Sequence, residues 1–215
     1  MTAVGTLFII SAPSGAGKSS LIDALLKRFN LDDSLRLSIS HTTRDMRPGD
    51  ADGVTYHFVS KEEFEALIAR GAFFEYAQVF DHYYGTSREN AEKWINEGKD
   101  VLLDIDWQGA RKIRAQVNNV CSIFILPPSL KELERRLNSR GRDSAEVIAD
   151  RMHKAQREIS HYQEYDYVIV NDDFDTALLQ LRAIILSKRV ELAKQQQRQA
   201  SLLADLTAGY VTENA

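Results

Sequence analysis

A glycine-rich loop near the amino terminus constrains this chain more than any other feature of its sequence. An apolar run at residues 6–11 precedes the loop, and a segment with Leu21, Ile22, Leu25 and Leu26 at helical spacing follows it. The loop itself reads Ala12-Pro13-Ser14-Gly15-Ala16-Gly17-Lys18-Ser19 and continues into Ser20. A strand, a glycine loop ending in lysine and serine, and a helix are typical of a P-loop, whose backbone N–H groups surround phosphate oxygens.

The residue types of this loop suit a nucleoside triphosphate such as ATP that carries Mg²⁺. Lys18 would reach the β- and γ-phosphates, and the Ser19 hydroxyl would bind the metal. Ala12 stands where the usual pattern has its first glycine, and alanine is acceptable there if its φ is negative. We therefore expect residues 12–20 to contact the nucleotide.

Two aspartates follow a second apolar run, at residues 101–105, and suggest where the metal binds. Asp104 ends that run, and we expect it to bind Mg²⁺ through water. Asp106, two residues later, is expected to point to the same face of the strand. One of the two aspartates could instead cap the helix that follows.

Strand and helix patterns alternate along most of the chain. This alternation predicts an α/β fold, in which a parallel sheet is covered by helices on both faces. Four predicted helices begin at pairs spaced as helix caps, namely Ser60 with Glu63, Thr86 with Glu89, Ser129 with Glu132 and Asp143 with Glu146. The stretch from about 38 to 86 has shorter strands and is predicted to be an insertion into that pattern. A helical pattern then runs from about 176 to 206, although residues near its end are too polar for a protein core.

The composition excludes several classes of protein. Hydrophobic residues make up 44% and charged residues 27% of the 215 residues, as in ordinary globular proteins. The net charge of −4 argues against a nucleic-acid partner, and no apolar run approaches the ~18 residues that span a membrane. A single cysteine, Cys121, fits a reducing cytoplasm, and the five histidines lack the spacing of a structural zinc site.

Further motifs follow the P-loop in a distinctive order. They are Ser38-Ile39-Ser40-His41-Thr42-Thr43-Arg44-Asp45-Met46-Arg47-Pro48-Gly49, Tyr56, Phe74-Glu75, Tyr83-Tyr84-Gly85-Thr86, Leu103-Asp104-Ile105-Asp106 and Ser139-Arg140-Gly141-Arg142. Together they closely resemble the guanylate kinase family, from about residue 5 to about 188. The resemblance implies a P-loop kinase fold with a nucleoside monophosphate-binding insert at about 38–86, a helical lid at about 139–151, and transfer of the γ-phosphoryl group of ATP to GMP.

The same resemblance assigns residues to the two substrates. It implies a GMP site made of Ser40, Arg44, Arg47, Tyr56, Glu75, Tyr84, Thr86 and Asp106. It places Arg140 and Arg151 in the lid over ATP and suggests Asn171 for the adenine. Lys18, Arg44, Arg140 and Arg151 are the residues that we expect to take part in the chemistry.

Physical chemistry makes the GMP assignments reasonable. The forked guanidinium groups of Arg44 and Arg47 suit a phosphate, and the hydroxyls of Tyr56 and Tyr84 add neutral donors. Guanine presents two adjacent donors on its Watson–Crick edge, and a carboxylate such as Glu75 accepts both. Sites built on such hydrogen bonds reject the wrong ligand by about 10⁴–10⁵.

Two other functions and the role of the tail stay open at this stage. The chain could be a P-loop kinase for another phosphorylated acceptor, or a non-catalytic guanylate-kinase-like module that binds proteins. The helical tail at 189–215 is either a solvated segment or a homo-oligomer contact through Leu202, Leu203 and Leu206.

Overall fold

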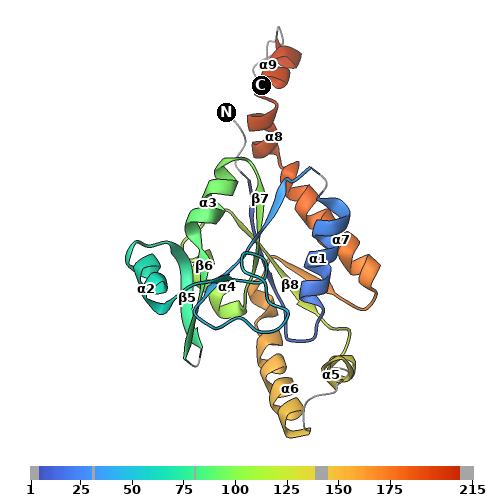
Figure 1. Ribbon diagram of the computed structural model, residues 1–215. Helices are drawn as coiled ribbons and strands as arrows, with labels where there is room; N and C mark the ends of the chain where they lie inside the picture. Colours follow the sequence, from blue (N-terminus) through green and yellow to red (C-terminus); the bar gives the residue numbers. More distant parts are fainter. Residues whose placement is uncertain (1–4, 31, 80, 139–144, 209–215) are drawn as a thin grey trace.

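The computed structural model describes residues 5–30, 32–79, 81–138 and 145–208. In this part of the chain a five-stranded parallel sheet has the order β2-β7-β1-β8-β9 (Figure 1). Its strands are β1 (Leu7–Ser11), β2 (Leu35–Ser38), β7 (Asp100–Asp104), β8 (Val120–Leu126) and β9 (Tyr167–Val170). The predicted parallel sheet is confirmed, and β1 lies at its centre.

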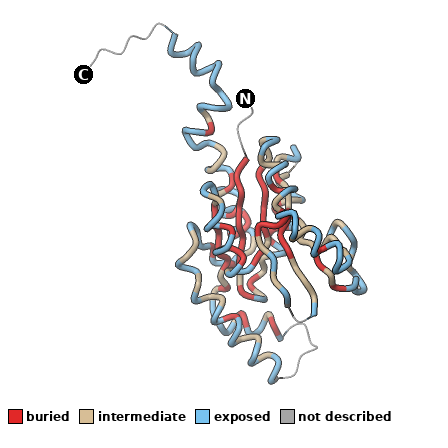
Figure 2. Tube along the Cα trace, turned by 90° about the vertical axis from the view of Figure 1, so that its left-hand side faces the viewer, coloured by how far each residue is buried: buried red, intermediate tan, exposed pale blue. Residues whose placement is uncertain are grey.

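Helices cover both faces of the sheet because the central strands are apolar on both sides. Helices α1 (Lys18–Phe29) and α7 (Phe174–Arg189) pack on Phe8 and Ile10, whose side chains are fully buried. Helices α3 (Arg88–Asn96) and α4 (Trp107–Arg114) cover the opposite face. Alternate residues of β1 therefore belong to different core clusters, as the period of two in a strand requires. Figure 2 shows the buried segments gathered in these central strands.

A second, mixed sheet lies within the stretch that the sequence marks as an insertion. Its order is β4-β3-β6-β5 among the described residues. The strands are β3 (His41–Thr42), β4 (His57–Phe58), β5 (Phe73–Val79) and β6 (His82–Ser87), and α2 (Lys61–Ala69) packs beside them. Gly85 of β6 lies so close to Phe64 and Phe73 that an added Cβ would come within 3.0 Å of their rings.

The helix caps show how well local sequence specified the helix ends. Ser60 caps α2 in the predicted capping box with Glu63. Ser129 accepts the N–H of Glu132 and so caps α5 (Leu130–Asn138) as predicted. The cap predicted at Thr86 is wrong by one residue, since the Ser87 hydroxyl accepts the N–H at the start of α3. Thr86 instead belongs to strand β6.

Helices α5 and α6 (Ala145–Ile159) form a small cluster of their own below the carboxyl ends of the strands (Figure 1). Leu133 and Leu137 of α5 pack against Ala155 of α6. Much of the predicted lid, including the predicted cap at Asp143, lies outside the described residues. None of the helices in the described part of the chain is long and apolar enough to cross a membrane.

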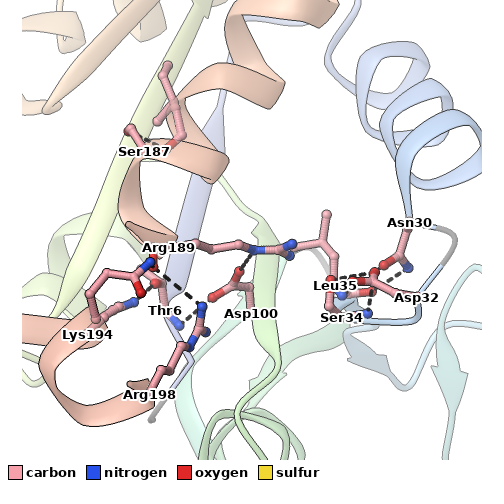
Figure 3. A network of polar contacts seen from close by, with 12 residues as sticks. Thr6, Asn30, Asp32, Ser34, Leu35, Asp100, Ser187, Arg189, Lys194 and Arg198 are labelled. Carbon is pink, nitrogen blue, oxygen red and sulfur yellow. Dashed lines mark hydrogen bonds and ion pairs between the residues drawn. The ribbon is translucent and has the colours of Figure 1, made fainter. Parts of the chain in front are cut away.

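The carboxyl-terminal helical pattern is interrupted rather than continuous. Helix α7 ends at Arg189, and α8 (Leu192–Arg198) and α9 (Ala200–Thr207) then extend away from the sheet (Figures 1 and 2). Contacts at the start of this tail fix it to the body. The buried Asp100 carboxylate accepts the Thr6 N–H at 2.8 Å and the Arg189 Nε at 2.6 Å, while Lys194 donates to the Thr6 hydroxyl (Figure 3).

Candidate active site

The P-loop connects β1 to α1 and takes its shape from two glycines. Gly15 and Gly17 have φ values of +90° and +93°, which favour glycine. The Ala16 N–H donates to the Pro13 carbonyl at 3.1 Å and closes a turn. A Cβ on Gly17 would lie 2.4 Å from the Asn171 Nδ2, so no larger residue fits there without movement.

Asn171 supports the backbone of this loop. Its side chain is buried and its amide donates to the Ala16 carbonyl at 2.7 Å. Its own backbone N–H donates to Leu126 at the end of β8. These contacts join the loop to the edge of the sheet, whereas the adenine contact suggested for Asn171 stays a prediction.

Lys18 and Asp104 form an ion pair beside the loop. The pairing of β1 with β7 sets Ile10 opposite Asp104, so the carboxylate reaches the first turn of α1 from the neighbouring strand. The structure therefore brings together the lysine and the aspartate that the sequence proposed for phosphate and metal. Ligands of parallel α/β sheets bind at this end of the strands.

A cavity of about 590 Å³ adjoins the loop, a volume typical of a small-molecule site. Its walls include Lys18, Ser19, Asp106, Arg136 and Glu158. Asp106 caps α4 by accepting the Gly109 N–H at 2.8 Å, so one of the two aspartates is indeed a helix cap. It still faces the cavity, and a cap does not exclude a ligand contact.

Helix α6 reaches the loop with two charged side chains. The Arg151 guanidinium donates to the Ser14 hydroxyl at 3.3 Å, and the Glu158 carboxylate accepts the Ser14 backbone N–H at 3.2 Å. Burial raises the pKa of Glu158 above its usual range, while that backbone hydrogen bond opposes the shift. Arg140, the other arginine predicted in the lid, lies outside the described residues.

The carboxyl end of α6 is fixed against α4. The rings of Trp107 and His161 stack with centroids 3.6 Å apart. Arg111 binds both carboxylate oxygens of Glu164 at 2.5 and 2.6 Å, and its guanidinium lowers the pKa of that residue to about 2. The helix that carries Arg151 is thereby anchored beside the helix that Asp106 caps.

The small sheet places Glu75 and Thr86 as a pair. The antiparallel register of β5 and β6 sets these residues opposite one another, and the Thr86 hydroxyl donates to the Glu75 carboxylate at 2.8 Å. Burial raises the pKa of Glu75. A Cβ built on Gly109 would lie 3.4 Å from Asp106 Oδ1 and 3.5 Å from Glu75 Cδ, so the two carboxylates flank the same helical turn.

An arginine and two tyrosines form a second side-chain cluster within the insert. The buried Arg44 donates to Asp50 at 2.9 Å, and its guanidinium lies 5.6 Å from the Tyr56 ring centroid. The Tyr56 and Tyr84 rings are 5.9 Å apart, and burial raises the pKa of Tyr56. This cluster brings three of the predicted GMP residues together.

The other two predicted GMP residues differ in their surroundings. Ser40 lines a cavity of about 180 Å³ together with Tyr56 and Asp104. Arg47 has an exposed side chain, and its backbone N–H donates to Asp50 at 2.8 Å. The structure therefore places Ser40 between the insert and the sheet, and leaves the Arg47 guanidinium toward solvent.

Comparison with known proteins agrees with this geometry. The family model described as guanylate kinase matches residues 4–188. A guanylate kinase of Vibrio parahaemolyticus is 63% identical and covers 95% of this chain and 98% of its own length; one of Shewanella oneidensis is 59% identical and covers 97% and 100%. The chain belongs to the guanylate kinase family. A crystal structure of guanylate kinase from Anaplasma phagocytophilum is 34% identical, with a TM-score of 0.72 over 94% of this chain and 96% of that one.

Two residues of the guanylate kinase cavity were missed by sequence reasoning. Arg136 donates to Glu132 at 2.8 Å and to the Asn171 carbonyl at 3.1 Å, which places it against the P-loop support. It belongs to an arginine-rich stretch that could have suggested it. Glu158 had no such signal, because its contact joins residues 144 positions apart.

Proposed function

We propose that this chain is an ATP:GMP phosphotransferase, which transfers the γ-phosphoryl group of ATP to GMP and releases ADP and GDP. The observation that carries the proposal is the position of Asp106. Asp106 lines the P-loop cavity and accepts the N–H of Gly109, and the Glu75 carboxylate of the Glu75–Thr86 pair lies beside that same glycine, so a donor site and a guanine-accepting pair adjoin. Membership of the guanylate kinase family supports the same reaction.

The acceptor is bound by complementary charge and hydrogen bonds. Glu75 would accept the two donors of the guanine edge, and Thr86 holds the carboxylate in place. Arg44, with Tyr56 and Tyr84, would bind the GMP phosphate, and Ser40 and Arg47 would complete this end of the site. A GMP phosphate is already an anionic nucleophile, so the reaction needs no dedicated general base.

The donor is held by the P-loop from Ala12 to Ser20 and by the lid. Lys18 would follow the charge of the transferring phosphoryl group, and Arg151 and Arg140 would close over it and exclude water. The contact of Arg151 with Ser14 supports a lid arginine next to the loop. Asn171 supports the loop and is proposed to lie near the adenine.

Mg²⁺ fits the oxygen groups of this site. Magnesium prefers oxygen ligands; Ser19 lines the cavity next to Lys18, and the Asp104 carboxylate pairs with Lys18. Ser19 would hold the ion directly and Asp104 through water. When bound, it neutralises charge on the β- and γ-phosphates.

The free thiol and the carboxyl-terminal tail bear on location and assembly. A buried free thiol, Cys121, supports a reducing compartment such as the cytoplasm. Leu202, Leu203 and Leu206 of α9 are exposed, which suits either a solvated tail or a homo-oligomer contact. A non-catalytic protein-binding module is not favoured, because the lysine and serine of the P-loop are intact.

A coupled assay of ADP release tests the proposal. ATP with Mg²⁺ would be offered with GMP, AMP, UMP, CMP or no acceptor. Turnover with GMP alone is expected. Turnover with another acceptor would keep the P-loop assignment and remove Glu75 from base recognition, whereas GMP binding without any turnover would favour the protein-binding module.

A further inference from the structure

Helix α6 contacts one residue of the P-loop through two side chains of opposite charge. Arg151 donates to the hydroxyl of Ser14, and Glu158 accepts its backbone N–H. Arg151 and Glu158 are seven positions apart, close to two helical turns, so both side chains lie on the same face of α6. A cation and an anion therefore approach the loop together.

The acid is unexpected at this place. A P-loop gathers N–H donors and positive charge for phosphate oxygens, and Glu158 lines the same cavity as Lys18 and Ser19. Its carboxylate is partly buried, which raises its pKa; the charge of Lys18 lowers that pKa and the charge of Asp106 raises it. An isolated anchor for α6 would not need a negative charge inside a polyanion site.

We propose that Glu158 is a positioning residue that weakens the grip of the donor site on ATP and ADP and so speeds nucleotide release. Its carboxylate competes with phosphate oxygens for the Ser14 N–H, and its charge repels the phosphates when it has given up that bond. Arg151, on the same face of α6, attracts the phosphates instead. The inference deepens the proposed function and rests on it, since it requires the P-loop to bind the donor.

Helix α6 is anchored close to the end that carries Glu158. Stacking of Trp107 on His161 and the bidentate Arg111–Glu164 pair hold the helix at its carboxyl end. Glu158 is near this fixed end, whereas Arg151 lies two turns further out. The anchored end therefore keeps the Glu158 carboxylate beside the Ser14 N–H.

The charge effect is testable by its dependence on phosphate number. Unit charges about 8 Å apart near a protein surface, screened by physiological salt, interact strongly enough to change affinity roughly three- to tenfold. Glu158→Gln keeps the size and one acceptor oxygen but removes the charge. It is expected to tighten ATP binding about three- to tenfold and ADP binding less, with GMP binding changed by under twofold, measured by calorimetry without divalent metal.

Asp150→Asn is the matched control. Asp150 is exposed on the same helix and pairs with Lys154 at 2.7 Å, so its loss removes the same charge away from the loop. All three nucleotides should bind this variant within twofold of the wild-type affinity. Glu158→Ala removes both the charge and the hydrogen bond to the Ser14 N–H, and it should also tighten ATP binding. Because alanine favours the helical conformation, this second variant keeps the test valid if glutamine disturbs α6.

Each remaining outcome decides against the inference. Unchanged or weaker ATP binding in both Glu158 variants would make the carboxylate an anchor of the loop. Equal tightening by Asp150→Asn would reduce the effect to the general charge of α6. A wild-type chain that binds GMP but neither ATP nor ADP would overturn the assigned donor site itself, and with it the proposed function.

Discussion

Glu75→Gln tests the base-recognition part of the site most directly. In the structure one carboxylate oxygen of Glu75 already accepts the Thr86 hydroxyl at 2.8 Å. The glutamine carbonyl is expected to keep this bond, which turns its NH₂ group toward the base. The two hydrogen-bond donors of guanine would then face the NH₂ group of the glutamine, which is also a donor. Adenine, which offers an acceptor at the same position, would be tolerated better.

The size of the effect follows from the chemistry of the pair. A hydrogen bond to a charged group contributes about 1.5–3 kcal/mol, so loss of one should raise the KM for GMP roughly ten- to hundredfold. Binding of ATP should stay within about twofold, because Glu75 belongs to the small sheet and not to the P-loop cavity. The stability should change little, since glutamine retains the Thr86 contact.

The assay compares kcat/KM for GMP and for AMP by coupled ADP release. Glu65→Gln is the matched control, because Glu65 is an exposed acid of the same insert that pairs loosely with Lys61 at 3.8 Å. The ratio of GMP to AMP activity should fall in the Glu75 variant alone. An unchanged ratio in a folded Glu75→Gln protein would remove Glu75 from the base site.

Three further changes probe the donor site and the packing around it. Lys18→Ala should lower kcat about 10²–10³-fold with GMP affinity unchanged, and near-normal turnover would show that the loop is not the donor site. Gly17→Ala should destabilise the protein by about 1–3 kcal/mol in urea titrations and abolish ATP binding, because it adds a Cβ 2.4 Å from Asn171. Gly49→Ala is its control: Gly49 also has a positive φ (+95°) but lies in open space, so this variant measures the cost of the backbone strain alone. The Arg111 guanidinium lowers the pKa of Glu164 to about 2. The contribution of Glu164 to stability is therefore present above its ordinary pKa and is lost as the pH falls from about 4.5 to about 2. Glu164→Gln should match the stability of the wild type at pH 2 and be less stable than the wild type at pH 6. Equal losses at both pH values would refute that electrostatic reason.

Local patterns were sufficient for the sheet and for the donor loop. The β1 strand, the loop and α1 each carry their own signal, and they are contiguous in sequence, so their arrangement follows without knowledge of distant contacts. The apolar run of β7 also predicted that Asp104 would end beside the loop, because parallel strands bring their carboxyl ends to one edge.

The errors arose where neighbouring residues offered equal signals. Thr86 and Ser87 both suit a helix cap, and strand pairing with Glu75 decides between them by using the Thr86 hydroxyl. The breaks after α7 and α8 carry neither glycine nor proline, the residues that normally mark a helix end.

Charge pairing around the two sites explains why an acidic chain suits repeated binding and release of phosphates. Lys18 contacts Asp104, Arg44 contacts Asp50, and Arg136 contacts Glu132. These carboxylates hold the cationic side chains in position before a substrate arrives, which limits the entropy lost on binding. Phosphate groups carry more charge than a carboxylate, so they displace or share these partners rather than meet isolated cations. The cost is lower affinity, which an enzyme that must release two nucleotides per turnover can tolerate. Glu158 extends the same principle from the cations to the backbone N–H groups of the loop.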